Sequence, residues 1–217
     1  MTWDGEAVKR RYDTTRRREA AGRTRRAVID AATELFLEQG YAVTTMAAIA
    51  RRAGVNTDTV YASVGAKPAL FRLLVETALS GRDHAVPAEE RDYVRAMRAE
   101  PDPAGKLAIY AGAMTRIHAR LAPLFAVLQT AAPSAPELGD LWREIAERRA
   151  ANMRLLAADL SATGRLRVDV DEAADVIWAT NSPEFYLLLV RDRGWAPERY
   201  ERWLAGSWTR LLLHAEP

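Results

Sequence analysis

Residues 40–70 read GYAVTTMAAIARRAGVNTDTVYASVGAKPAL, and this stretch predicts two short helices joined by a tight turn. The first helix is expected over residues 45–53, because the Thr45 hydroxyl can cap its first turn. Gly54 follows, and glycine readily adopts the left-handed conformation that a sharp turn requires. The second helix is expected over about 57–63. The stretch therefore predicts a helix-turn-helix.

A helix-turn-helix has specific physical requirements. Its first helix is short and crosses the phosphate backbone of DNA, and its second helix exposes N-terminal residues to base edges in the major groove. Here the second helix carries small polar side chains in its first turns, and Val60 is placed to pack on the core. An ordinary helical hairpin can also contain an Ala-Gly-Val turn, so the turn by itself leaves both alternatives open.

Helical periodicity continues along the rest of the chain, and strand signals are nearly absent. A polar stretch at residues 81–90 marks the expected domain boundary. We therefore expect an all-α fold with a basic flexible arm at 1–22, a three-helix helix-turn-helix domain at 23–80 and a helical C-terminal domain at 81–217. Helices outside the motif are expected over about 24–39, 68–80, 88–99, 104–121, a short segment after Pro123, 136–163, 171–193 and 197–214.

The composition excludes several classes of protein. None of the 217 residues is cysteine, so disulfides, thiolate metal sites and a cysteine nucleophile are excluded, and the three histidines lie far apart in the sequence. The sequence has no phosphate-binding glycine loop, nucleophile elbow or metalloprotease motif, so we expect no enzyme, no cofactor and no metal. A charged N-terminus and the lack of a long apolar run favour a cytoplasmic protein with no membrane partner.

The charge is distributed unevenly along the chain. Nine of the first 26 residues are Lys or Arg and four are Asp or Glu, whereas the whole chain has a net charge of only +2. A basic end on a slightly acidic body indicates a polyanion partner at that end. A solvated, disordered tail explains the same pattern equally well.

The motif stretch resembles the tetracycline-repressor (TetR) family of regulators. The resemblance covers residues 23–79. In place of the His-Phe that commonly follows the recognition-helix tyrosine in that family, this chain has Ser63 and Val64, which affects the expected operator sequence rather than DNA binding itself. The matching residues, in order and at the family's spacing, are Gly40-Tyr41, Thr45-Met46, Ile49-Ala50, Ala53-Gly54-Val55, Thr59-Val60-Tyr61, Lys67 and Leu70.

The resemblance implies a DNA-binding transcriptional regulator. It implies a repressor that binds a palindromic operator in double-stranded DNA as a homodimer and is released by a small-molecule effector. The alternative is a helical adaptor that binds protein and has no specific DNA site. An adaptor explains the helices but not the recognition-helix chemistry, and salt dependence separates the two, because counterion release weakens DNA binding steeply.

The family pattern implies roles for individual residues. The second helix would lie in or beside the major groove, while Tyr61 and Lys67 would contact phosphates. Ala47 can offer contact with a thymine methyl group, and Asp58 either accepts from a cytosine amino group or serves only as favourable charge at the helix start. The candidate DNA-binding residues are Arg25, Arg26, Thr45, Ala47, Arg51, Thr57, Asp58, Thr59, Tyr61, Ser63 and Lys67.

Polar residues interrupt apolar helical rows in the C-terminal domain. Asn181 lies in one such row, Arg149 and Asn152 in a second and His118 in a third, and Pro183 should kink the helix beside Asn181. Such groups fit a mostly apolar ligand pocket, but each could equally be a hydrogen-bonded core residue. The candidate ligand-binding residues are Tyr110, Met114, His118, Trp142, Arg149, Asn152, Met153, Trp178, Asn181 and Phe185.

The final helix carries a broad apolar face. The resemblance implies that the last two helices pair with those of a second subunit in a four-helix bundle, although such a face could equally pack within one chain. A palindromic site favours the dimer. The candidate interface residues are Tyr186, Trp203, Leu204, Ser207, Trp208 and Leu211.

Overall fold

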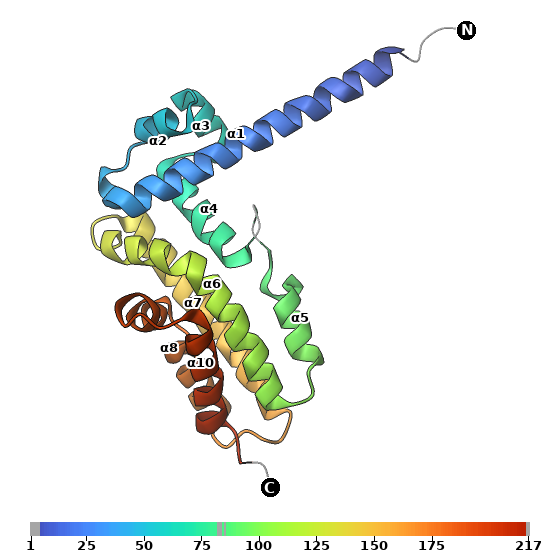
Figure 1. Ribbon diagram of the computed structural model, residues 1–217, viewed down its shortest axis with the longest axis vertical. Helices are drawn as coiled ribbons and strands as arrows, with labels where there is room; N and C mark the ends of the chain where they lie inside the picture. Colours follow the sequence, from blue (N-terminus) through green and yellow to red (C-terminus); the bar gives the residue numbers. More distant parts are fainter. Residues whose placement is uncertain (1–4, 82–83, 85, 216–217) are drawn as a thin grey trace. The chain divides into compact units, whose positions relative to one another are not determined.

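The computed structural model describes residues 5–81, 84 and 86–215. Within these ranges the chain is helical, apart from one isolated antiparallel bridge between Leu166 and Leu213, so the predicted all-α class is confirmed (Figure 1). The chain divides into two compact units, Met1–Leu74 and Val75–Pro217. No helix of the described residues has the length and apolar character needed to cross a membrane.

The N-terminal unit is built on one long helix. It contains α1 (Gly5–Val43), α2 (Met46–Ala53), α3 (Thr57–Val64) and the first half of α4 (Lys67–Ser80). The core forms where the apolar row of α1 meets α2, α3 and α4, and it is closed by three aromatic rings. Phe36 stacks on Tyr41 at 5.6 Å, and the edge of Phe71 meets both rings at 5.2 and 5.5 Å.

The helix α1 is longer than predicted. It extends back to Gly5, over most of the stretch expected as a flexible arm. The residues there are mainly Arg, Lys, Glu and Ala, which have high helix propensity, and no proline interrupts them. At the other end Gly40 has φ 80° and breaks the helix. The buried Thr44 hydroxyl then donates to the freed carbonyl of Gly40 at 2.8 Å.

The C-terminal unit is a helical bundle. In it α6 lies against α5, α7, α9 and α10, while α8 packs on α7 (Figure 1). Its elements are the second half of α4, the short 3-10 turn η1 (Ala88–Glu90), α5 (Asp92–Ala99), α6 (Pro103–Ala131), α7 (Pro136–Ser161), α8 (Val170–Thr180), α9 (Pro183–Tyr186), the π-helical turn η2 (Leu187–Asp192) and α10 (Pro197–Leu212).

Two proline predictions are wrong. Pro123 does not separate two helices but lies inside α6, because the apolar residues on both sides of it are buried in one continuous row. By contrast, the helix expected over 171–193 is divided rather than kinked. Asn181 leaves the helical conformation with ψ 57°, and the Ser182 hydroxyl caps α9 by accepting from Phe185 N at 3.2 Å.

The unit boundary also differs from the expected one. It lies within α4, between Leu74 and Val75, rather than after residue 80. Leu70 and Phe71 are buried in the N-terminal core, whereas Glu76 and Leu79 line a cavity of the C-terminal unit. One continuous helix therefore belongs to both units, which a boundary inferred from loop composition could not reveal.

Candidate functional site

Local side-chain chemistry fixes the turn between α2 and α3. The Thr45 hydroxyl caps α2 by accepting from Ala48 N at 3.1 Å. The helix ends at Gly54, whose left-handed φ of 69° allows its amide to bond back to the last turn. The Asn56 side chain then caps α3 by accepting from Asp58 N at 3.1 Å. Both helices have the extents predicted from the sequence, to within one residue.

The helix α3 has one buried face and one exposed polar face. Val60 is completely buried and Val64 nearly so, which anchors the helix on the core of its unit. Asp58 and Thr59 are exposed, and Tyr61 is 49% exposed despite its aromatic ring. The first turns of α3 thus present donors, an acceptor and a hydroxyl-bearing ring to solvent.

Two residues of the predicted DNA-binding set hold α3 in place. The Ser63 hydroxyl donates to the Val60 carbonyl at 3.0 Å, and the Arg25 guanidinium donates to the Ser63 carbonyl. Thr57 is half-buried at the start of the helix. Arg25 and Ser63 therefore have structural contacts that sequence reasoning did not anticipate.

The basic side chains near the motif differ in their partners. Arg52 forms ion pairs with Glu34 at 2.9 Å and Glu38 at 3.0 Å on α1, and this pairing lowers the pKa of Glu38. The neighbouring Arg51 is exposed, as are Arg26 and Ala47. A phosphate would therefore meet an unneutralised guanidinium at Arg51 but a paired one at Arg52.

Lys67 lies at the start of α4. Its ammonium group is 4.2 Å from the centroid of the Tyr41 ring and 3.5 Å from the Ala42 carbonyl oxygen. The Tyr41 ring thus supports the Lys67 stem from below, because Gly40 turns the chain so that this ring packs on the core. The conserved order of motif residues in the sequence becomes a spatial cluster around the ends of α1 and α3.

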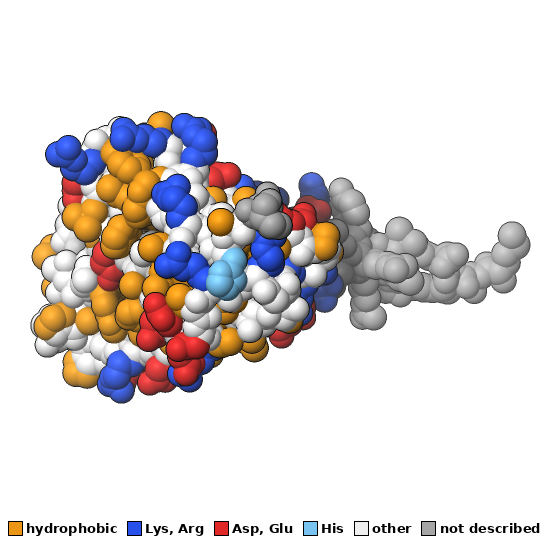
Figure 2. Space-filling model, turned by 90° about the horizontal axis from the view of Figure 1, so that it is seen from below, with side chains coloured by type: hydrophobic (Ala, Val, Ile, Leu, Met, Phe, Trp, Pro, Cys, Tyr) orange, Lys and Arg blue, Asp and Glu red, His pale blue; other side chains and the backbone are white. Residues whose placement is uncertain are grey.

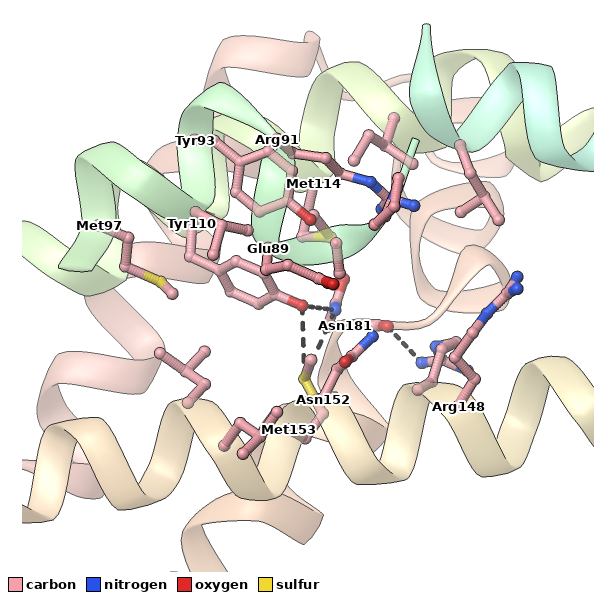
Figure 3. Close-up of a pocket in the computed structure, with 18 of the residues that line it drawn as sticks. Glu89, Arg91, Tyr93, Met97, Tyr110, Met114, Arg148, Asn152, Met153 and Asn181 are labelled. Atoms are coloured by element: carbon pink, nitrogen blue, oxygen red, sulfur yellow. Dashed lines mark hydrogen bonds between the residues drawn. The ribbon is translucent and has the colours of Figure 1, made fainter. Parts of the chain in front are cut away.

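A second candidate site is a cavity of about 610 Å³ within the C-terminal unit. Its walls come from the second half of α4, η1, α5, α6 and α7, and its inner end is the break between α8 and α9 (Figure 3). Most of the predicted ligand-binding residues line it: Tyr110, Met114, His118, Arg149, Asn152, Met153 and Asn181.

Three predicted ligand-binding residues lie elsewhere. Trp142 stacks on Phe125 at 4.7 Å, and Phe185 stacks on Trp203 at 5.9 Å. Trp178 is 38% exposed on the outside of α8. Helical periodicity identified the row to which each belongs, but the break at Asn181 changes the direction of the chain, so Phe185 does not follow Asn181 into the cavity.

A polar network lies at the inner end of the cavity. The Asn181 amide donates to the Tyr110 hydroxyl at 2.8 Å, and that hydroxyl donates to Met153 Sδ at 3.4 Å (Figure 3). Arg149 donates to the carbonyl of Trp178 at 2.9 Å and to that of Asn181. Because the helix break leaves these carbonyls without helical partners, Arg149 replaces the missing backbone donors.

The titratable groups at this end are held neutral. Burial, together with the charge of Arg149, lowers the pKa of His118 to about 3, so its imidazole is uncharged at neutral pH. Burial likewise raises the pKa of the Tyr110 phenol well above its usual range. The polar inner end of the cavity therefore offers hydrogen bonds rather than charge.

The cavity wall includes residues that the sequence did not single out. Tyr93 and Met97, four residues apart on α5, contribute one side (Figure 3). Lys106 is buried, where it forms an ion pair with Asp159 at 2.8 Å and donates to the Met97 carbonyl at 3.0 Å. The spacing of Tyr93 and Met97 was the available signal, but α5 is too short for periodicity to show which neighbour it covers.

The apolar face of α10 is used within the single chain. Its central row, Tyr200, Leu204, Trp208 and Leu212, is fully buried. Trp208 also donates through its indole nitrogen to the Thr180 hydroxyl at 2.7 Å. Leu204 and Trp208, and the buried Tyr186, were therefore wrong as interface candidates, since none of them faces outward.

The neighbouring row of α10 is more open. Trp203, Ser207 and Leu211 follow one another at four-residue spacing, and Leu211 is 47% exposed. Figure 2 shows hydrophobic side chains gathered on one face of the molecule and edged by charged ones. Large apolar side chains exposed in the C-terminal unit include Trp178, Leu188 and Leu211.

Comparison with known families identifies the N-terminal domain. The model of bacterial regulatory proteins of the tetR family matches residues 28–74. The HTH-type transcriptional regulator HbdR of Aromatoleum sp. (strain CIB) is 38% identical over 65 residues, which are 30% of this chain and 28% of HbdR. The chain thus matches little more than a quarter of that relative's length.

Comparison with solved structures extends the likeness to the whole fold. NalD, the secondary repressor of the MexAB-OprM multidrug efflux pump in Pseudomonas aeruginosa, is similar with a TM-score of 0.70 and 22% identity, over 91% of this chain and 100% of NalD. A protein from Saccharomonospora viridis in complex with choline has a TM-score of 0.65 and 17% identity, over 88% of this chain and 98% of that one. From its helix-turn-helix domain and its fold, the chain belongs to the tetR family of bacterial regulatory proteins.

Proposed function

We propose that this protein is a ligand-responsive transcriptional repressor that binds a palindromic DNA operator as a homodimer. The observation that carries the proposal is α3, which is anchored by Val60 and Val64 and turns a polar face with Thr59 and Tyr61 to solvent. Small polar groups on the exposed first turns of a second helix are the means by which this motif reads base edges.

Basic side chains beside α3 support the proposal. Arg26 and Arg51 are exposed, and Lys67 begins the next helix beside the motif. The N-terminal part of α1 adds Arg16, Arg18 and Arg23 on exposed positions. Phosphate contacts of this kind set affinity and register, while the α3 residues set sequence preference.

The effector part of the proposal is supported by the cavity. Its volume is typical of small-molecule sites, and the related fold from Saccharomonospora viridis was solved with choline bound. The helix α4 begins in the core beneath α3 and ends at the cavity wall. A ligand that favours one position of the α4 end would shift the dimer between DNA-binding and released states, in proportion to its differential affinity for the two.

The test is selection of binding sites from a randomised duplex pool, followed by titrations at two salt concentrations. We expect a palindromic site, with binding lost when Thr59 and Tyr61 are both changed to Ala. The pair Arg51→Ala and Arg52→Ala provides a matched comparison of adjacent arginines. Arg51→Ala should lower the salt slope by about one unit, whereas Arg52→Ala should change it less, because Arg52 is held by Glu34 and Glu38.

The outcome also decides between the two classes considered. Selective, salt-sensitive binding that depends on α3 supports the repressor. Absence of any selected sequence, with or without added small molecules, would contradict it and favour the adaptor that binds protein through apolar surface.

A further inference from the structure

We infer that the cavity of the C-terminal unit takes an uncharged aromatic molecule with one hydrogen-bonding head group, which the amides of Asn152 and Asn181 receive. This inference rests on the proposed function only in calling that molecule an effector. It follows from how polar atoms, charges and methionines are distributed over the cavity wall.

The polar atoms gather at one end. Asn181 is only 3% exposed, and its Oδ1 has no hydrogen-bond partner among the described residues. Asn152 lies near it on α7, half-buried and lining the same cavity, and its amide is likewise unpartnered in the described part of the chain (Figure 3). Unmade hydrogen bonds at buried groups are costly, so a ligand that satisfies them gains affinity.

The charges at the wall are already compensated. Arg149 is engaged by two backbone carbonyls, Arg148 pairs with Glu76 at 2.8 Å, and Lys106 pairs with Asp159 at 2.8 Å. The exposed wall residues Glu89 and Arg98 carry opposite charges. An ionic ligand would lose its hydration without gaining an unpaired counter-ion, which is unfavourable in an apolar cavity.

The rest of the wall is apolar and adaptable. Three of the five methionines of the chain, Met97, Met114 and Met153, line the cavity. Methionine fills irregular space and makes favourable contacts between its sulfur and aromatic rings. Tyr93 and Tyr110 add flat aromatic surface on the same side (Figure 3). This lining favours a ring system over a branched or strongly polar molecule.

The experiment uses four probes that share one ring system. Naphthalenemethanol carries a neutral hydroxyl, methylnaphthalene has no head group, naphthoate is an anion and naphthylmethylammonium is a cation. Binding of each to the full chain is measured by isothermal titration calorimetry in the absence of DNA. We expect the alcohol to bind about tenfold more tightly than the other three, as one added hydrogen bond in a buried site provides.

The variant Asn152→Leu tests where the head group is received. It keeps the volume of a half-buried side chain, so it should fold, and it should bring the affinity for the alcohol down to that for methylnaphthalene. Trp142→Phe, outside the cavity, is the control and should leave the preference intact. Tighter binding of either ion, an unchanged preference in Asn152→Leu, or no binding of any probe would overturn the inference.

The effector role is read separately from binding. If the alcohol binds as expected but does not release the protein from its operator, the ligand class stands and the proposed effector mechanism fails. If DNA binding itself is absent, the calorimetric result is unaffected, because it is obtained without DNA.

Discussion

His118 is an ionisable group that the fold holds in one protonation state. It lies on α6 with its ring 5.9 Å from that of Tyr186, and burial lowers its pKa to about 3. The charged group that acts on it is Arg149 of α7, which disfavours the imidazolium. In the unfolded chain its pKa is about 6.5, so unfolding takes up a proton below that pH.

The linkage gives a signed prediction. Above about pH 6.5 neither state binds the proton and His118 has no effect on the pH dependence of stability. As the pH falls below that value only the unfolded state is protonated, so the free energy of unfolding should fall by about 2 kcal/mol by about pH 5. Urea unfolding followed by tryptophan fluorescence measures this, since five tryptophans lie in the C-terminal unit.

The variant His118→Gln removes this loss. It should show a free energy of unfolding that depends less on pH than that of the wild type over the same range, and the difference cancels the contributions of other groups. Equal pH dependence in the two proteins would show that His118 is protonated in the folded chain.

At the scale of elements, the α2–α3 turn depends on one backbone conformation. Gly54 has a φ of 69°, and a Cβ added there would contact nothing within 4 Å. Any cost of a substitution is therefore backbone strain rather than collision. Gly22 offers the opposite case, since it is an exposed residue inside α1 whose added Cβ would also contact nothing.

These two glycines form a matched pair. Gly54→Ala should destabilise the helix-turn-helix by about 1–2 kcal/mol, the cost of a left-handed L residue, and should weaken operator binding. Gly22→Ala should stabilise α1 by about 0.5–1 kcal/mol. Hydrogen exchange of the Val60 and Val64 amides measures the first effect. Unchanged exchange rates in Gly54→Ala would mean that the turn tolerates another conformation.

At the scale of the whole molecule, dimerisation needs an outward surface. The central row of α10 is consumed by packing on α6 and α8. The adjacent row of Trp203, Ser207 and Leu211 is the part of that helix left open, so we assign the proposed interface to it. A charged side chain buried there without a partner would oppose association.

The double variant Ser207→Arg and Leu211→Arg should therefore be monomeric where the wild type is dimeric. Its affinity for a palindromic operator should fall while each half-site is still recognised. Sedimentation equilibrium gives the oligomeric state, and Leu37→Arg on α1 is the control at an exposed leucine of the other unit. A variant that remained dimeric would place the interface on another surface.

The sequence determined much of this architecture by itself. Thr45 and Gly54 fix the ends of α2 through contacts within a few residues, and local chemistry of this kind is legible in sequence. The polar residues Asn181, Asn152, Arg149 and His118 interrupted apolar rows, and the structure brings all of them to one cavity.

The tertiary structure decided what periodicity leaves undefined. A row of apolar residues shows that a helix face is covered but not by what, so Trp208 and Leu204 are buried within the chain although they were expected at a dimer interface. Pro123 and Pro183 have the same intrinsic chemistry, yet one lies inside α6 and the other follows a break. Packing on neighbouring helices offsets the lost hydrogen bond at Pro123, whereas at Asn181 the Arg149 side chain takes up the freed carbonyls. These partners are 29 and 32 residues apart in sequence, so only the folded chain brings them together.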